Sequence, residues 1–121
     1  MHEPDPPVLD DATLADVRAS VADDAEFVAD LVRTYLSDSP THLAAIADAV
    51  ANDDAAALVR PAHTLKSSSA TVGAMRISAR ARRIEMAARA GTIDDDTRSD
   101  AGQLDDDWNA TTRALEAWMA R

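Results

Sequence analysis

The sequence predicts an all-α protein: an antiparallel up-down-up-down four-helix bundle with a short extra N-terminal helix. The chain is rich in alanine and has three glycines among its 121 residues. It shows no strand-length alternation of apolar and polar residues. Apolar residues recur instead at three- and four-residue spacing, and turn residues separate these segments. A chain of this length is suited to a single domain with one core.

Residues 1–10 are acidic and proline-rich, which predicts a flexible leader, and residues 11–121 are predicted to form the bundle domain. The short extra helix is expected from about Asp11 to Val21. Leu14 and Val17 are three residues apart, so both should face inward from the same side of this helix.

The next apolar stripe begins at about Ala25 and predicts a helix as far as Leu36. It contains Phe27, Val28, Leu31, Val32, Tyr35 and Leu36. Ser39 followed by Pro40 is typical of an N-cap and the first helical position. The stretch that continues to Val50 is therefore predicted as a separate helix or as the second half of one kinked helix.

Turn residues delimit three further helices. Asn52-Asp53-Asp54 predicts a turn, Gly73 and Gly91 predict helix ends, and Thr92 to Asp96 reads as an acidic loop. The expected helices run over about Ala55–Val72, Met75–Ala90 and Thr97–Ala120.

Two residue types within these helices carry their own expectations. Pro61 lies inside a predicted helix, where proline removes a backbone hydrogen bond, so we expect a bend near residues 57–61. Trp108 and Trp118 are ten residues apart on the last helix. We expect Trp108 in the core and Trp118 over the end of the bundle, since aromatic residues at helical spacing are usually packing residues.

Composition and charge exclude several classes of function. The chain has no cysteine, so it can form neither a disulfide nor a thiolate metal site. It has 22 acidic and 12 basic residues and a net charge of −10, which disfavours nucleic acid as a partner. It has neither a membrane-spanning apolar run nor a secretory signal, so we expect a cytoplasmic protein that does not enter membranes.

The basic residues are unevenly distributed. The segment from Arg60 to Arg89 holds seven of them and only one acidic residue, Glu85. Such asymmetry favours an acidic protein partner, although a solubilising surface would produce the same pattern. Arg76, Arg80 and Arg83 share a stripe beside the apolar one, so all three are expected to be exposed.

His63 poses the central question, because it could be a core residue, a metal ligand or a reactive group. On a helix it falls opposite the apolar arc, which predicts an exposed ring and disfavours the core. Lys66, Ser67 and Ala70 share its face. No histidine or carboxylate lies three or four residues further on to share a metal, so the metal reading is weak. A nucleophilic histidine fits better, with Lys66 placed to hold a transferred phosphoryl group.

The residues around His63 also resemble a known family. The stretch HTLKSSSATVGA, preceded by PA, is similar to the AH-x-L-K-G-S-S-x-x-x-G-A signature of histidine-containing phosphotransfer domains. The resemblance extends over about residues 10–92 and is weakest in the last helix. The family most often has glycine where this chain has Ser67, which bears on partner choice and transfer rate.

The resemblance implies a phosphorelay intermediate without kinase activity of its own. His63 would accept a phosphoryl group from an aspartate of one receiver domain and pass it to another, and Lys66 would support the phosphoryl oxygens. Receivers of response regulators or hybrid histidine kinases would be the partners and would supply Mg²⁺, so this chain would need no cofactor. The expected partner-binding residues are Ser67, Ala70, Gly73, Arg60, Arg76, Arg80 and Arg83.

Three alternatives remain open. A histidine kinase acting alone is disfavoured, because the chain has no glycine-rich phosphate loop and no room for a nucleotide-binding domain. The chain could be a helical docking module that does not use His63 chemically. It could also be the phosphotransfer domain of a larger hybrid or chemotaxis kinase, with residues 1–10 as the linker.

Overall fold

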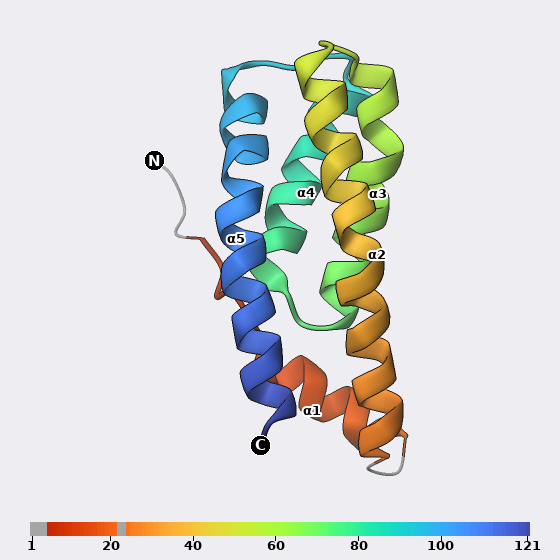
Figure 1. Ribbon diagram of the computed structural model, residues 1–121. Coiled ribbons are helices and arrows are strands. Elements are labelled where there is room, and N and C mark those ends of the chain that lie inside the picture. The colour runs from red at the N-terminus through yellow and green to blue at the C-terminus, as the bar shows by residue number, and fades with distance from the viewer. Residues whose placement is uncertain (1–4, 22–23) are drawn as a thin grey trace.

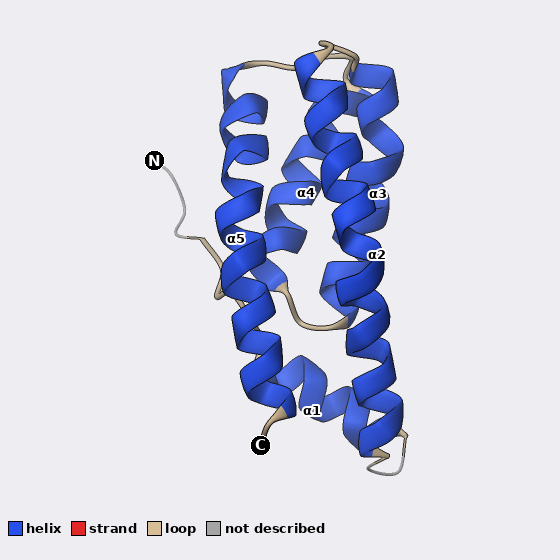
Figure 2. Cartoon of the chain, in the orientation of Figure 1, coloured by secondary structure: helices blue, strands red, loops and turns tan. Residues whose placement is uncertain are grey.

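The computed structural model describes residues 5–21 and 24–121, and these form five helices joined by short turns (Figure 1). No described residue lies in a strand (Figure 2), which confirms the predicted all-α class. The helices are α1 (Asp11–Ser20), α2 (Ala25–Ala51), α3 (Ala55–Thr71), α4 (Met75–Arg89) and α5 (Asp95–Met119).

Helices α2 to α5 form the bundle, and each packs against the helix that follows it in the chain. Helix α5 also packs against α2, which closes the ring, and α1 packs against α2. Helices α2 and α5 have 27 and 25 residues, whereas α3 and α4 have 17 and 15. The longer pair therefore extends about 15 Å beyond the shorter pair. Figure 1 shows α1 lying across that end, below the turn that joins α3 to α4.

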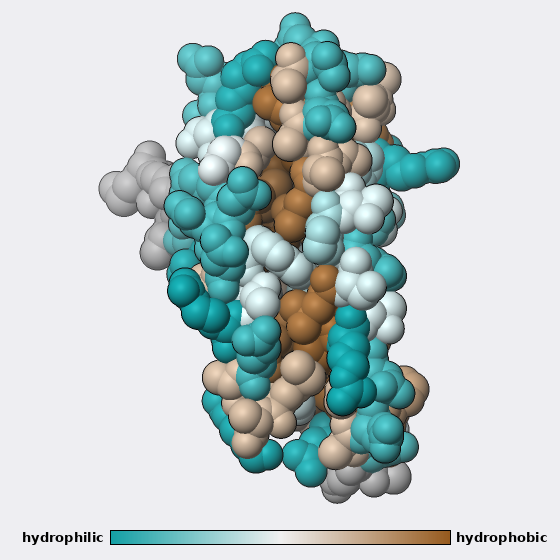
Figure 3. Space-filling model, in the orientation of Figure 1, coloured by the Kyte–Doolittle hydropathy of each residue, from teal (hydrophilic) through white to brown (hydrophobic). Residues whose placement is uncertain are grey.

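This arrangement divides the apolar core into two clusters. One lies among the four bundle helices and includes Ile46, Leu65 and Ile84. The other lies at the α1 end, where Leu14 packs with residues such as Leu115. Trp108 packs against both clusters. Figure 3 shows hydrophobic residues along the furrow between α2 and α5 and hydrophilic residues on the outer faces of both helices.

Four helices begin at an aspartate whose side chain accepts a hydrogen bond from a backbone N–H of the first turn. These N-caps are Asp10, Asp24, Asp54 and Asp94. Such caps satisfy N–H groups that have no partner within the helix, and their negative charge favours the positive end of the helix dipole. The cap at Asp94 starts α5 two residues earlier than the sequence predicted, so the acidic loop is shorter than expected.

Two expectations for α2 are wrong. Ser39 is not an N-cap, because α2 continues as one helix through Pro40. Ser39 is buried, and its hydroxyl donates a hydrogen bond of 2.6 Å to the carbonyl oxygen of Tyr35. Phe27 is half exposed rather than part of the buried stripe, since it lies in the first turn of α2, at the edge of the bundle.

Pro61 lies within α3, which is assigned as one helix from Ala55 to Thr71. Its ring is buried against the bundle, so the residue contributes to packing. The bend expected near residues 57–61 stays a prediction. Trp118 is partly buried and packs against the cluster at the α1 end.

Residues 5–10 make defined contacts that the prediction of a flexible leader did not foresee. The Arg76 guanidinium donates a 3.0 Å hydrogen bond to the carbonyl oxygen of Pro6, and Leu9 packs against the α1-end cluster. The backbone N–H of Asp10 donates to the carbonyl oxygen of Gly73 at 2.7 Å. The first four residues of the predicted leader lie outside the described residues. Within the described ranges, no helix is long and apolar enough to cross a membrane.

Candidate functional site

His63 lies on the outer face of α3, and 52% of its side chain is exposed. The opposite face of the helix is buried, as the periodicity predicted: it carries Leu58, Ala62, Leu65, Ser69 and Val72. The prediction that His63 is not a core residue is therefore confirmed. Because the buried arc fixes the rotation of α3, it also fixes the direction in which His63 points.

Glu85 on α4 is the residue that joins His63 to Lys66. Its side chain is only 6% exposed. Its carboxylate lies 2.9 Å from Nδ1 of His63 and 2.6 Å from Nζ of Lys66, and Arg89 approaches it to 2.7 Å. One buried acid thus holds the exposed imidazole and two cations in a fixed arrangement.

The protonation state of Glu85 determines which imidazole nitrogen is free. Burial alone would raise the pKa of Glu85, but hydrogen bonds from Lys66, Arg89 and His63 lower that pKa to about 2. Glu85 is therefore ionised at neutral pH and can only accept hydrogen bonds. Nδ1 of His63 must then carry the proton, so in the neutral ring Nε2 holds an unprotonated lone pair.

Two further contacts fix α3 between its neighbours. The hydroxyl of Ser78 on α4 donates a 2.9 Å hydrogen bond to the carbonyl oxygen of Lys66. On the other side, the hydroxyls of Ser69 and Tyr35 are 2.8 Å apart in the buried interior. Burial raises the pKa of Tyr35 to about 12, so its hydroxyl stays protonated near neutral pH. These contacts limit movement of the helix that presents His63.

The small residues expected beside His63 differ in exposure. Ser67 is exposed and Ala70 is partly buried, and both are small enough to leave the approach to the ring open. Gly73 is buried, so it is not part of this surface. Its φ of +78° ends α3, and a Cβ there would lie 2.6 Å from the carbonyl oxygen of Asp10. Its role is to let residues 5–10 approach the backbone.

Within residues 5–21 and 24–121, no three histidine or carboxylate side chains gather in a way that could hold a metal ion. Among the described residues, Glu85 is the carboxylate that contacts His63, and its two cationic partners would repel a metal. The site is thus suited to a nucleophilic imidazole beside positive charge.

Comparison with known proteins agrees with this geometry. The profile of the Hpt domain matches residues 30–118, which is most of the chain. The chain belongs to the Hpt domain family. Its structure is similar to the crystal structure of histidine-containing phosphotransfer protein B (HptB) from Pseudomonas aeruginosa PAO1, with a TM-score of 0.82 and 25% identity over 95% of this chain and 96% of that one. No curated protein matches the sequence.

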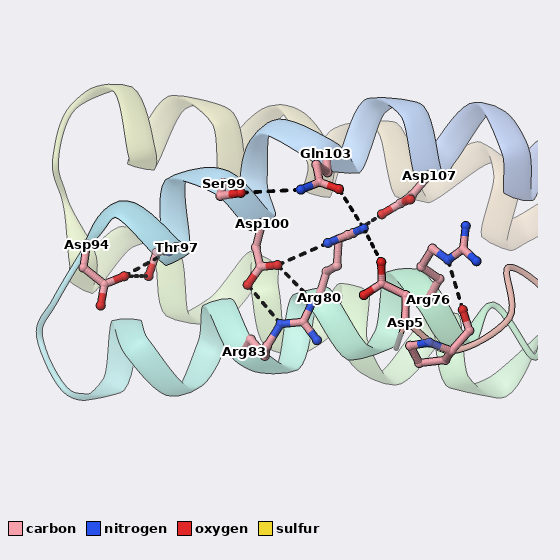
Figure 4. Close-up of polar contacts among 11 residues, drawn as sticks. Asp5, Arg76, Arg80, Arg83, Asp94, Thr97, Ser99, Asp100, Gln103 and Asp107 are labelled. Carbon is pink, nitrogen blue, oxygen red and sulfur yellow. Dashed lines mark hydrogen bonds and ion pairs between the residues drawn. The ribbon is translucent and has the colours of Figure 1, made fainter. Parts of the chain in front are cut away.

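In this Hpt domain the arginines expected to face a partner are divided between two sides of the bundle. Arg60 is exposed on α3. Arg80 is buried between α4 and α5, so the prediction that it is exposed is wrong. It donates to Asp107 and to Gln103 on α5, with an ion pair to Asp5 at 3.1 Å (Figure 4).

Arg83 and Arg76 belong to the same side as Arg80. Arg83 donates two hydrogen bonds to Asp100, which also pairs with Arg80 (Figure 4). The guanidinium of Arg76 donates a hydrogen bond to the carbonyl oxygen of Pro6. The stripe of Arg76, Arg80 and Arg83 therefore faces α5 and residues 5–10. Acidic side chains of α5 compensate the charge of Arg80 and Arg83. The stripe is turned away from Glu85 and His63 by more than 120° around α4.

The residue that sequence reasoning missed is Glu85. The sequence shows it as the one acid of a basic segment and predicts no role for it. The signal was available in that same observation, since Glu85 is the only carboxylate between Asp54 and Asp94. In the structure this single acid pairs with two of the seven basic residues of the segment, Lys66 and Arg89.

Proposed function

We propose that this chain is a phosphorelay intermediate: His63 accepts a phosphoryl group from a phosphoaspartate of one receiver domain and passes it to an aspartate of another. The observation that carries the proposal is the 2.9 Å contact between Nδ1 of a half-exposed His63 and the ionised Glu85. This contact leaves Nε2 as the nucleophile. Membership of the Hpt family and the similarity to HptB, a histidine-containing phosphotransfer protein, support the same reaction.

In the forward step, the Nε2 lone pair attacks the phosphorus of the acyl phosphate. The Nε2–P bond forms, the bond between phosphorus and the aspartyl oxygen breaks, and aspartate leaves as a carboxylate. The ring keeps its proton on Nδ1 and becomes a cationic phosphoimidazolium. The carboxylate of Glu85 stabilises that positive charge, so no proton has to move. Attack by the aspartate of the second receiver reverses these bond changes.

Lys66 contributes positive charge at the site. In the resting chain its ammonium is bound to Glu85, and about a third of the side chain is exposed. A flexible lysine with three donors can keep one bond to Glu85 and turn another toward a phosphoryl oxygen. The incoming receiver would supply Mg²⁺, and this chain would supply no nucleotide site, so it would act as a phosphocarrier without ATP-dependent activity. We expect the relay to operate in the cytoplasm, whether this chain acts alone or within a larger hybrid or chemotaxis kinase.

The test is transfer of radiolabelled phosphate from a panel of purified phosphorylated receiver domains. We expect acid-labile, base-stable label on the wild-type chain and none on His63→Gln. Label that persists in His63→Gln would assign the reaction to another residue. No label on the wild type from any receiver would favour a docking module, and label from ATP alone would favour a kinase.

A further inference from the structure

The outer surface of the α3/α4 hairpin is basic and has no exposed carboxylate. Between Asp54 and Asp94 the only acidic residue is Glu85, and it is buried. The whole chain has a net charge of −10 although this segment is positive, so the rest of the protein is strongly acidic. This hairpin is therefore a positive region on a negative molecule, and His63 is exposed on it.

Most basic side chains of the protein are already used in internal contacts. Within the described residues, Arg60, Arg82 and Arg113 make neither an ion pair nor a side-chain hydrogen bond, and all three are exposed. Two of these, Arg60 and Arg82, belong to the hairpin. Exposed guanidinium groups without a carboxylate nearby remain free to bind a partner.

Helical geometry places both of these arginines beside His63. Arg60 precedes it by three residues, so it lies one turn away on the same face of α3. On α4, Arg82 lies between Ser78 and Glu85, which contact Lys66 and His63 respectively. Because the two helices run antiparallel, Arg82 is level with the His63–Lys66 turn, on the outer side of α4.

One large apolar side chain lies on the same surface. Met86 follows Glu85 directly, so it points about 100° away from the inward-facing carboxylate and toward solvent. It is 60% exposed, and with Phe27 it is one of two large apolar side chains found exposed in the described residues. Flexible methionine side chains are common at surfaces that bind more than one partner. A phosphorelay intermediate must bind at least two.

We propose that Arg60, Arg82 and Met86 form the surface that docks the acidic face of a receiver domain against His63. The inference rests on the proposed function and specifies where the partner binds. The two arginines steer the carboxylates around the partner's phosphoaspartate toward the ring, and Met86 supplies an apolar contact that tolerates different partners. Arg76, Arg80 and Arg83, on the opposite side of α4, take no part.

The test uses the receiver that labels wild-type His63 fastest. In Arg60→Glu/Arg82→Glu we expect kcat/KM for transfer to fall about tenfold at low salt, with kcat at saturating receiver little changed, and the loss to shrink at high salt. The charge-matched control is Arg113→Glu/Arg121→Glu. Arg113 lies on α5, which packs mainly against α4 and α2, and Arg121 follows that helix and pairs with Asp11 of α1. This control should change kcat/KM less than twofold. Met86→Ser should weaken transfer independently of salt.

Binding is measured separately in a His63→Gln background, by anisotropy of the fluorescently labelled receiver. We expect Arg60→Glu/Arg82→Glu to weaken this binding by a similar factor. Wild-type transfer and binding in that variant, or an equal loss in the α5 control, would reject the docking surface while leaving His63 as the acceptor. If no receiver labels wild-type His63, the proposed function fails and the docking surface fails with it.

Discussion

Nδ1 of His63 on α3 lies 2.9 Å from Oε2 of Glu85, which is 22 residues further along the chain on α4. The same carboxylate binds Lys66 through its other oxygen. The contact between His63 and Glu85 makes the orientation of the exposed ring depend on how α3 packs against α4. It also distinguishes the two ring nitrogens chemically, because only Nδ1 faces the carboxylate. Several measurable consequences depend on it and on the contacts around it.

Replacing Glu85 with alanine should change the tautomer of His63. Without the carboxylate, the neutral ring loses the hydrogen bond that keeps its proton on Nδ1, so Nε2 is protonated in part of the molecules. We expect phosphotransfer to slow by about tenfold or more, by analogy with metal-bound histidines, which lose about that much activity when the partner that orients the ring is removed. Nitrogen-15 NMR of the ring measures the tautomer directly.

The exposed Glu116 provides the control for that experiment, since Glu116→Ala removes a carboxylate from α5, whereas His63 and Glu85 lie on α3 and α4. This substitution should leave both the tautomer and the transfer rate unchanged. A Glu85→Ala protein with a wild-type ring spectrum and a wild-type rate would contradict the assigned role of Glu85.

Replacing Arg80 with methionine should destabilise the fold rather than weaken partner binding. Arg80 is 5% exposed, and its removal leaves the buried Asp107 without its cation, whereas Asp100 keeps Arg83. We expect a loss of about 3–5 kcal/mol in the free energy of unfolding, the usual cost of breaking a buried ion pair. Arg82→Met, two residues away but exposed, should change stability by about 0.5 kcal/mol or less. Denaturant unfolding followed by circular dichroism compares the two, and equal stability would disprove the buried network's importance.

Gly73 and Gly91 form a matched pair for measuring the contact with residues 5–10. Both have positive φ, +78° and +82°, so alanine at either site costs about 1–2 kcal/mol of backbone strain. Only at Gly73 would the new Cβ also meet the carbonyl oxygen of Asp10, whereas nothing lies within 4 Å at Gly91. Gly73→Ala should therefore lower the thermal midpoint clearly more than Gly91→Ala. An equal decrease in the thermal midpoint of the two variants would show that residues 5–10 move away from the methyl group without loss of stability.

Stability at acid pH should depend on Glu85. Its pKa is lowered from 4.5 to about 2 in the folded chain by Lys66, Arg89 and His63. A lowered pKa stabilises the fold fully above pH 4.5, and this contribution is lost as pH falls through about 2. The stability advantage of the wild type over Glu85→Gln should thus shrink between those two values. Denaturant midpoints of the two proteins, measured across this pH range, give the difference in stability. A difference that does not change with pH would argue against the lowered pKa of Glu85.

The amino-acid sequence by itself determined the helices and the direction of His63. Turn residues, glycine stops and the three-to-four spacing of apolar residues are local signals, so the starts expected at about Asp11, Ala25, Ala55 and Met75 agree with the structure. The apolar arc that includes Leu58 and Leu65 required the opposite face of that helix to be exposed. These features involve residues close in the chain, where sequence spacing translates directly into spatial position.

Tertiary structure alone decided which charges meet. Periodicity on α4 could not distinguish Arg80 from Arg82, because both lie outside its apolar stripe. Arg80 became buried only because α5 brings Asp107 beside it. Glu85 likewise acquired its role from α3, and the segment around Pro6 was held by Arg76. Contacts between segments distant in sequence depend on how helices pack, and a charged residue on a helix flank can face either solvent or a compensating charge.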